Sequence, residues 1–371
     1  MAGIYIHIPF CRQACTYCNF HFSVSLKNKN AMILAIANEI TNCKDFIADK
    51  NIETIYFGGG TPSLLNANDF KIIFDAIHAK FTVSKNAEIT LEANPDDIGK
   101  NILSMWQLLG INRLSVGLQS FNDTELKWMN RAHNAAQSLQ CLDYIEAAGF
   151  TNISVDLIYG SPLQSNKDLI ENFNLIAQRN IKHISCYALT VENKTALHKL
   201  IKEKKCENVN SESQAKHFKL LLTLMKANGY EQYEISNFCK PGFRSKHNSS
   251  YWQGKAYFGF GPSAHSYNGN NKRRWNVANN SLYLQNNNFF EEEILLETDM
   301  VNEYVMTSLR TSEGLDIDFV AKKFGKEHSE RILLAAKKYL QMDRLIVDDS
   351  TLKLTNDGKF FADGISSDLF V

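Results

Sequence analysis

The sequence predicts an α/β fold in which a parallel sheet is followed by a small, mainly helical C-terminal domain. In the first half of the chain, apolar strand-like runs alternate with amphipathic stretches of helical length. Such alternation implies parallel strands joined by right-handed helical crossovers. Near the C-terminus the order changes to three helical stretches and a short hairpin. The alternation leaves open whether the sheet is flat or curls towards a barrel.

Six apolar, strand-like runs account for the parallel sheet. They are residues 4–8, 54–57, 88–92, 113–117, 154–158 and 183–187. Glycines and polar residues cluster just after the strand ends, as in "YFGGGTPS" and "DLIYGSP". In parallel α/β architectures, ligands bind at that rim of the sheet. We therefore expect the functional site there.

The rest of the chain divides into two further segments. Residues 229–296 are rich in Gly, Asn and aromatic residues and have little helical periodicity, which predicts an irregular extension. Residues 297–371 contain three helical patterns, "MVNEYVMTSLRT", "DIDFVAKKFG" and "SERILLAAKKYLQ", and then the hairpin "LIVDDSTLKLT". Three helices and a hairpin suggest a winged-helix-like domain. We therefore expect domains at residues 1–228, 229–296 and 297–371.

The composition is that of an ordinary globular protein with no global attraction for polyanions. The chain has 371 residues, 44% of them hydrophobic, and its 40 basic residues balance its 40 acidic residues. We expect no nucleic-acid partner, because the last helix of the C-terminal domain offers few cations. The sequence shows no secretory signal and no transmembrane segment, which predicts a cytoplasmic protein.

Three cysteines lie close together after the first strand-like run, in "CRQACTYC". Cytoplasmic thiols stay reduced, so Cys11, Cys15 and Cys18 indicate metal or redox chemistry ahead of disulfides. A structural zinc site needs four ligands; no second CxxC pair exists in the chain, although His7 and His21 could complete a site. Three thiolates on one tight loop suit three corners of a 4Fe–4S cluster whose fourth iron is open.

The CxxxCxxC loop, with the aromatic Tyr17 before its last cysteine, resembles the signature of the radical S-adenosylmethionine superfamily. The resemblance implies a partial, TIM-like (β/α)6 barrel. It also implies S-adenosylmethionine bound at the open iron, from which the reduced cluster generates a 5′-deoxyadenosyl radical. The residues implied as contacts of this molecule are Tyr5, Gly59 and Glu92.

Longer motifs narrow the resemblance to the oxygen-independent coproporphyrinogen III oxidase branch of that superfamily. Similar segments, among them "IYIHIPFC", "RLSVGLQSFND" and "YEISNF", run from about residue 4 to residue 267. That branch binds a second S-adenosylmethionine. The matching positions in this chain are Tyr17, Gly60, Thr61, Gln119, Arg131, Asp156 and Ala188.

Two departures from the oxidase favour its sister group, the haem chaperones. The oxidase carries a further cysteine two residues after the third, where this chain has Phe20. In addition, "HNSSYW" matches the HNxxYW motif of the chaperones. The match implies His247 as an axial ligand of haem iron, with Tyr251 and Trp252 offering flat apolar surface to the porphyrin. His265, in "GPSAHSY", is a competing ligand.

The resemblance therefore predicts a radical S-adenosylmethionine protein that carries haem as its cargo. Its implied partners are haem or another porphyrin, an apo-haemoprotein acceptor and a reduced electron donor. One alternative is an oxidase that decarboxylates coproporphyrinogen III to protoporphyrinogen IX, against which the missing fourth cysteine argues. A second alternative is a zinc-stapled binding protein with a winged-helix module. The motifs leave open whether S-adenosylmethionine is cleaved.

Overall fold

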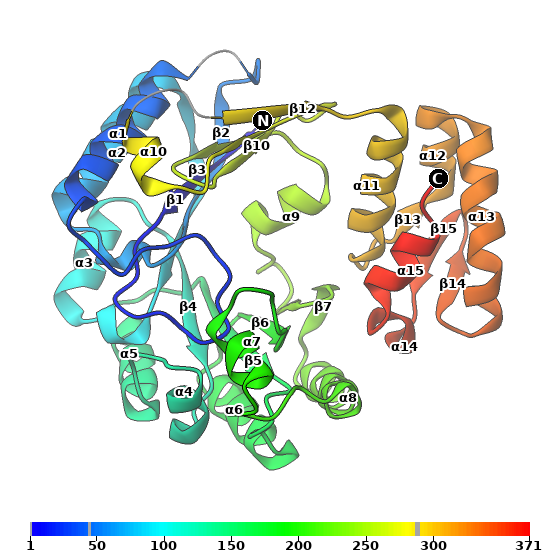
Figure 1. Ribbon diagram of the computed structural model, residues 1–371, viewed down its shortest axis with the longest axis horizontal. Coiled ribbons are helices and arrows are strands. Elements are labelled where there is room, and N and C mark those ends of the chain that lie inside the picture. The colour runs from blue at the N-terminus through cyan, green and yellow to red at the C-terminus, as the bar shows by residue number, and fades with distance from the viewer. Residues whose placement is uncertain (1, 44–45, 286–289) are drawn as a thin grey trace.

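The computed structural model describes residues 2–43, 46–285 and 290–371, and one curved sheet runs through most of it. The strand order in this sheet is β12-β11-β10-β9-β1-β2-β3-β4-β5-β6-β8-β7. Its six parallel strands are β1 (Ala2–Ile8), β2 (Asn51–Gly59), β3 (Thr82–Ala93), β4 (Arg113–Gln119), β5 (Ile153–Tyr159) and β6 (His183–Ala188). The predicted α/β fold is confirmed, and the sheet curls into a partial (β/α)6 barrel (Figure 1).

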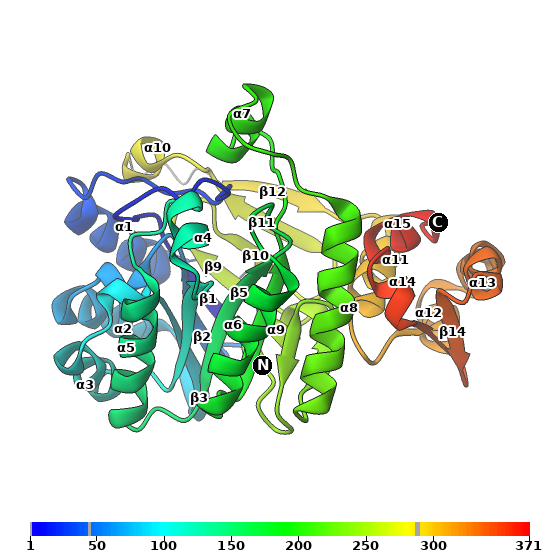
Figure 2. The same cartoon turned by 90° about the horizontal axis from the view of Figure 1, so that it is seen from below.

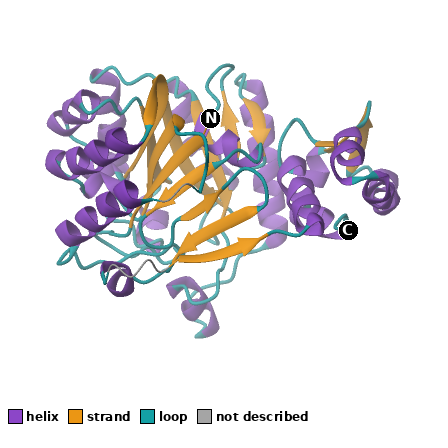
Figure 3. Cartoon of the chain, turned by 90° about the horizontal axis from the view of Figure 1, so that it is seen from above, coloured by secondary structure: helices purple, strands orange, loops and turns teal. Residues whose placement is uncertain are grey.

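Helices cover the outer, convex face of the parallel strands (Figure 3). They are α1 (Lys29–Asn42), α2 (Ala67–Lys80), α3 (Lys100–Leu108), α4 (Asp123–Trp128), α5 (Ala135–Ala147), α6 (Asn166–Gln178) and α8 (Ser211–Ala227). Capping boxes begin α2, α5 and α6 at Asn66, Asn134 and Ser165. Between these helices and the sheet lies a continuous apolar core.

Helix α7 (Ala196–Lys202) stands apart from this layer, beyond the carboxyl ends of the strands (Figure 2). The backbone N–H of Leu197 donates to the carbonyl of Thr16 at 2.7 Å. Helix α7 therefore buttresses the loop that carries the three clustered cysteines.

Residues 229–296 are more regular than the sequence suggested, because they contain six short strands of the main sheet. The strands are β7 (Glu231–Glu234), β8 (Asn237–Cys239), β9 (Tyr257–Phe260), β10 (His265–Tyr267), β11 (Lys272–Asn276) and β12 (Phe290–Ile294). Helices α9 (Lys246–Trp252) and α10 (Asn280–Leu284) lie between them. These elements are too short to leave a periodic pattern in the sequence. The division of the chain at residues 228 and 296 stays a prediction.

The C-terminal domain contains the three predicted helices and the predicted hairpin, and a two-residue strand lies between the first and second helices. Its elements are α11 (Glu297–Leu309), β13 (Leu315–Asp316), α12 (Ile317–Phe324), α13 (Lys326–Gln341), β14 (Leu345–Asp348) and β15 (Thr351–Leu354). Two short helices that the sequence did not reveal follow, α14 (Asn356–Lys359) and α15 (Ala362–Asp368). The domain has an apolar core of its own, and α8 lies between it and the barrel (Figure 2). Among the described helices, none has the length and apolar character needed to cross a membrane.

Candidate functional site

The carboxyl ends of the parallel strands border a cavity of about 850 Å³. The cysteine loop after β1 lines one side, and residues from α14, α15 and the β7–β8 turn line another. Most of the predicted cluster and S-adenosylmethionine residues line this one cavity: Cys11, Cys15, Cys18, Tyr17, Gly59, Gly60, Thr61, Glu92, Gln119, Arg131, Asp156 and Ala188. Tyr5 is the exception. The fold thus gathers residues that are widely separated in the sequence.

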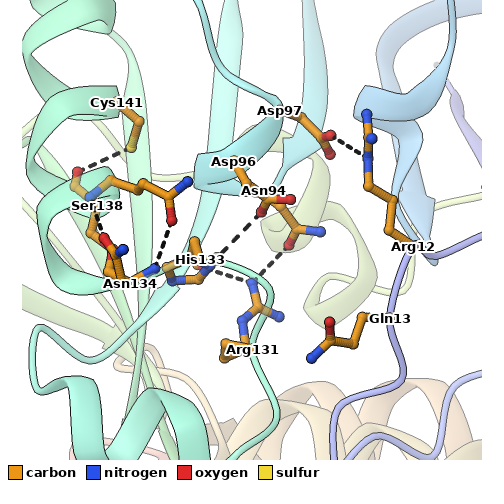
Figure 4. Close-up of polar contacts among 12 residues, drawn as sticks. Arg12, Gln13, Asn94, Asp96, Asp97, Arg131, His133, Asn134, Ser138 and Cys141 are labelled. Carbon is orange, nitrogen blue, oxygen red and sulfur yellow. Dashed lines mark hydrogen bonds and ion pairs between the residues drawn. The ribbon is translucent and has the colours of Figure 1, made fainter.

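The cysteine loop is fixed by contacts to the segments that follow helix α4 and strand β3. The backbone N–H of Thr16 donates to the carbonyl of Met129 at 3.0 Å. Nε of Arg12 pairs with Oδ1 of Asp97 at 2.9 Å, which ties the loop to the end of β3 (Figure 4). The side chain of Gln13 donates to the carbonyl of Asn130 at 3.0 Å. The loop is therefore held in place by the protein itself.

The chemistry of the three thiols fits an iron–sulfur cluster. Burial raises the pKa of Cys11 to about 11, and the neighbouring Cys18 and Cys15 contribute to this rise. A bound cation offsets such a penalty, because it stabilises the thiolate form. In the described part of the chain, no three Cys, His, Asp or Glu side chains converge on one point as a single ion requires. A cluster offers each thiolate its own iron, so it does not need this convergence.

Arg131 places a fixed positive charge beside the cysteine loop. Its Nη1 lies 3.2 Å from Sγ of Cys15, and its Nη2 donates to Oδ1 of Asn94 at 2.7 Å (Figure 4). Burial disfavours the charged guanidinium, but Tyr17 and Cys15 more than offset it and raise the pKa of Arg131. Its Nε is buried and has no hydrogen-bond partner among the described residues. Arg131 is thus placed to compensate thiolate charge and still has one donor free for a ligand.

Glycines allow the end of β2 to pass closely beneath the cysteine loop. A Cβ atom at Gly60 would lie 2.5 Å from the carbonyl oxygen of Phe10 and 2.8 Å from that of Ile8. Neither backbone oxygen can move away without disturbing the loop. The "GGGTP" motif therefore has a steric role, whatever it contributes to ligand binding.

Glu92 is a buried carboxyl group on the floor of the cavity. The hydroxyl of Tyr56 donates to its Oε1 at 2.7 Å, and Tyr5 stacks on Tyr56 with ring centroids 6.1 Å apart. Burial raises the pKa of Glu92 to about 7; nearby Asp156 adds to the rise, whereas hydrogen bonds from Tyr56 and Gly59 oppose it. Tyr5 therefore packs on Tyr56, the residue that donates to Glu92, and does not itself line the cavity.

Two further predicted residues have features typical of ligand sites. Gln119 ends β4 with a φ of 68°, a left-handed conformation that is costly for a residue with a side chain. Burial raises the pKa of Asp156 to about 6, and its Oδ1 has no hydrogen-bond partner among the described residues. Strained backbone and an unsatisfied carboxyl oxygen both favour a polar ligand in this part of the cavity.

The HNSSYW motif forms helix α9, and its residues do not line the cavity. His247 is 1% exposed and lies near the amino ends of β1 and β2. Its Nδ1 is 2.8 Å from Oγ1 of Thr54, and its Nε2 is 2.8 Å from the hydroxyl of Tyr251. Burial lowers the pKa of His247 to about 3, so the imidazole is neutral. Both ring nitrogens are engaged, and ligation of haem iron, which stays a prediction, requires His247 to leave these partners.

The other residues predicted around haem also lie outside the cavity. His265 is on β10, where its ring stacks on Trp275 with centroids 6.0 Å apart. Trp252 reaches the cavity indirectly, because the guanidinium of Arg310 lies 5.4 Å from the centre of its indole ring and Arg310 lines the cavity. The motif therefore supports the cavity wall from behind.

No pattern in the sequence predicts the cavity wall that the C-terminal domain supplies. Arg310, Lys359, Phe360 and Phe361 all line the cavity. Lys359 and the two phenylalanines lie in "GKFFADG", where the only signal is an adjacent aromatic pair. Such a pair in a short helical segment is typical of a domain core, so tertiary structure was needed to find this wall.

Comparisons with known proteins agree with this geometry. Residues 5–176 match the radical SAM superfamily, and residues 295–361 match the HemN C-terminal domain. The chain is 31% identical to the haem chaperone HemW of Bacillus subtilis over 98% of both chains. It is 30% identical to the haem chaperone HemW of Escherichia coli, covering 86% of this chain and 85% of that protein.

Among solved structures, the coproporphyrinogen III oxidase HemN from Escherichia coli has a similar fold. The TM-score is 0.86 at 21% sequence identity, over 100% of this chain and 90% of that chain. At this identity the likeness concerns the fold, including the placement of the C-terminal domain beside the barrel.

Proposed function

The chain belongs to the haem chaperone HemW family within the radical S-adenosylmethionine superfamily, and from this premise we propose that it binds haem and delivers it to apo-haemoproteins. Membership of the superfamily carries with it a 4Fe–4S cluster and S-adenosylmethionine as cofactors. Haem is then the cargo. The haem chaperone HemW of Bacillus subtilis matches 98% of this chain, so the proposal covers both the barrel and the C-terminal domain.

The observation that carries the proposal is the exposed aromatic surface of the cavity. Phe20, Tyr187 and Phe361 line the cavity and are 67%, 43% and 44% exposed. Large exposed apolar side chains that surround a concave site indicate a flat apolar ligand. Haem has such a face, and a cavity of about 850 Å³ is near the upper end of the range for ligand sites.

Within this proposal, Cys11, Cys15 and Cys18 hold the cluster, and Gly59, Glu92 and Tyr5 serve the first S-adenosylmethionine. When bound, the cluster supplies one-electron chemistry at S-adenosylmethionine. This chain's own residues orient the cofactors: Arg131 compensates thiolate charge, and Glu92 offers an acceptor on the cavity floor. The residues proposed for a second S-adenosylmethionine are Tyr17, Gly60, Thr61, Gln119, Arg131, Asp156 and Ala188.

Phe20 bears on the alternative oxidase activity. Its phenyl ring is exposed at the cavity, at the position where the oxidase carries its fourth cysteine. A phenyl ring can neither ligate metal nor take part in thiol chemistry, whereas it can pack on a porphyrin face. We therefore place the oxidase second, and the zinc-stapled alternative finds no support in the family to which the chain belongs.

The test combines haem transfer with product analysis. The anaerobically reconstituted protein should develop a Soret band on titration with haem and should pass that haem to an apo-haemoprotein. With coproporphyrinogen III, S-adenosylmethionine and a reductant, it should form no protoporphyrinogen IX. Multiple turnovers to protoporphyrinogen IX, without haem transfer, would support the oxidase instead.

The proposal also includes two protein partners, an electron donor and a haem acceptor. A reduced electron donor must supply the electron that the cluster uses, and an apo-haemoprotein must accept the cargo. We also propose a cytoplasmic setting, where the three cluster cysteines stay reduced, and no nucleic-acid partner for the C-terminal domain.

A further inference from the structure

Lys359 is a cationic side chain on the C-terminal wall of the cavity. It ends α14, and its Nζ donates to Oε1 of Gln232 at 2.8 Å and to Oδ1 of Asn356 at 3.1 Å. An ammonium group has three donors, so these two neutral amide oxygens leave one donor available. Within residues 2–43, 46–285 and 290–371, no carboxylate lies within ion-pair distance of Nζ.

The other cations that line the cavity have partners of their own. Arg12 pairs with Asp97, and Arg310 pairs with Glu234 and Asp363. Arg131 lies against Cys15 at the cysteine loop. Burial lowers the pKa of Lys359, and no nearby carboxylate opposes that effect. A partly buried ammonium without a counter-charge favours an anionic ligand.

Aromatic side chains adjoin this cation. The ring centroids of Phe360 and Phe361 are 5.4 Å apart. The ring centroids of Phe360 and of Phe218 on α8 are 6.5 Å apart. All three rings line the cavity. The wall thus combines one unpaired cation with flat apolar surface, which matches a ligand that is apolar over its face and carries a carboxylate at its edge.

We propose that Lys359, beside Phe360 and Phe361, forms a carboxylate-binding subsite that holds a propionate group of the cargo haem. The subsite rests on the proposed haem-binding function and adds to it the group that orients the porphyrin. Haem enters with its propionates towards the C-terminal domain and its opposite edge towards the cysteine loop.

The test removes the ammonium group of Lys359 and the carboxylates of haem, separately and together, and compares the resulting affinities. Haem and haem dimethyl ester, in which both carboxylates are esterified, are titrated into the parent chain and Lys359→Met. The parent should bind haem about tenfold or more tightly than the variant does, because a hydrogen bond to a charged group is lost. Both proteins should bind the ester equally. Lys359→Arg should restore haem affinity, and Lys337→Met, at an exposed lysine on α13 away from the cavity, should match the parent.

The outcomes separate this subsite from the function on which it rests. Binding of the ester by Lys359→Met shows that the variant is folded. Equal haem affinity in the parent and Lys359→Met would overturn the subsite while leaving haem binding intact. Equal losses for haem and for its ester would also overturn it, because the lost contact would not involve a carboxylate. A parent chain that binds neither ligand would overturn the proposed function, and the subsite with it.

Discussion

At the scale of single residues, the three clustered cysteines differ from the other five by position, because they share one loop and one cavity. We expect Cys15→Ala to lose the cluster, since three thiolates are the fewest that leave a single iron open. Cys206→Ala is the matched control, because Cys206 is also partly exposed but lies outside the cavity. Iron and sulfide analysis after anaerobic reconstitution gives the measurement. Full cluster content in Cys15→Ala would contradict the assignment.

We expect the affinity for S-adenosylmethionine to depend on pH through the protonation of Glu92. Its pKa is raised to about 7, first by burial and then by Asp156. Below that pH the neutral acid predominates, and above it the carboxylate predominates. A carboxylate accepts hydrogen bonds from an amino group better than a neutral acid does, so affinity for S-adenosylmethionine should rise as pH increases from about 6 to about 8.

Two variants test whether Glu92 causes this pH dependence. Glu92→Gln should bind more weakly and should show no step near pH 7. Asp156→Asn should keep the step but move its midpoint to lower pH, because removal of a neighbouring negative charge lowers the pKa of Glu92. Calorimetric titration of the reconstituted protein provides the affinities. An unchanged step in Glu92→Gln would assign the titration to another group.

At the scale of elements, α9 closes the amino end of the barrel through His247. The buried carboxylate of Glu88 accepts hydrogen bonds from the backbone N–H groups of His247 and Lys246, at 3.0 and 3.1 Å. His247 also stacks on Tyr56, the residue that donates to Glu92, with ring centroids 5.0 Å apart. A continuous set of contacts therefore joins the HNSSYW helix to the cavity floor.

We expect His247→Ala to lower the free energy of unfolding by about 1–3 kcal/mol, because it leaves the buried hydroxyls of Thr54 and Tyr251 without their partner. If His247 is only an anchor, the haem Soret band should stay unchanged; if it leaves its partners to ligate iron, the band should shift or disappear. The geometry favours the unchanged band. His265→Ala is the control, because His265 is exposed and is the competing ligand. A lost Soret band with unaltered stability would establish ligation by His247.

The elements also show what the sequence could predict. The six parallel strands have apolar runs and sharp polar ends, so both their places and the site at their carboxyl ends could be predicted. The strands of residues 229–296 could not, because segments of three to five residues such as β8 and β11 carry no usable period. Helix α9, with seven residues, is likewise too short to show a helical period. His247 is buried against Thr54, which is distant in the sequence. No local sequence pattern can predict such a contact.

At the scale of the whole molecule, the C-terminal domain stands against the barrel and supplies one wall of the cavity. Backbone hydrogen bonds cross this boundary from Ile235 to Arg310 at 3.1 Å and from Ser312 to Tyr233 at 3.1 Å. Chain topology alone did not indicate that the last two helices would contribute to a site at the first strand. The cavity is thus lined by residues from the loop after the first strand and by residues from the last two helices.

Arg310 joins the C-terminal domain to a buried carboxylate of the main sheet, and we expect its loss to lower the free energy of unfolding. Its Nε and Nη2 lie 3.1 and 3.0 Å from Oε1 of Glu234 on β7, and its Nη1 lies 2.8 Å from Oδ1 of Asp363 on α15. The side chain of Glu234 is 1% exposed, so Arg310→Met would leave a buried carboxylate without its cation. We expect a loss of about 2–3 kcal/mol, less than for a fully buried pair because Arg310 is 23% exposed.

The matched control for Arg310→Met is Lys219→Met, which removes a pair with Asp357 at the same boundary, between α8 and α14. Both members of that pair are more than half exposed, so solvent screens their attraction and the unfolding midpoint should stay close to that of the parent. Urea denaturation of the three proteins under identical conditions gives the free energies. Because Arg310 also lines the cavity, its loss should weaken haem binding, and Lys219→Met should not. Equal stability of Arg310→Met and the parent would mean that the pair with Glu234 does not stabilise the contact between the C-terminal domain and the barrel.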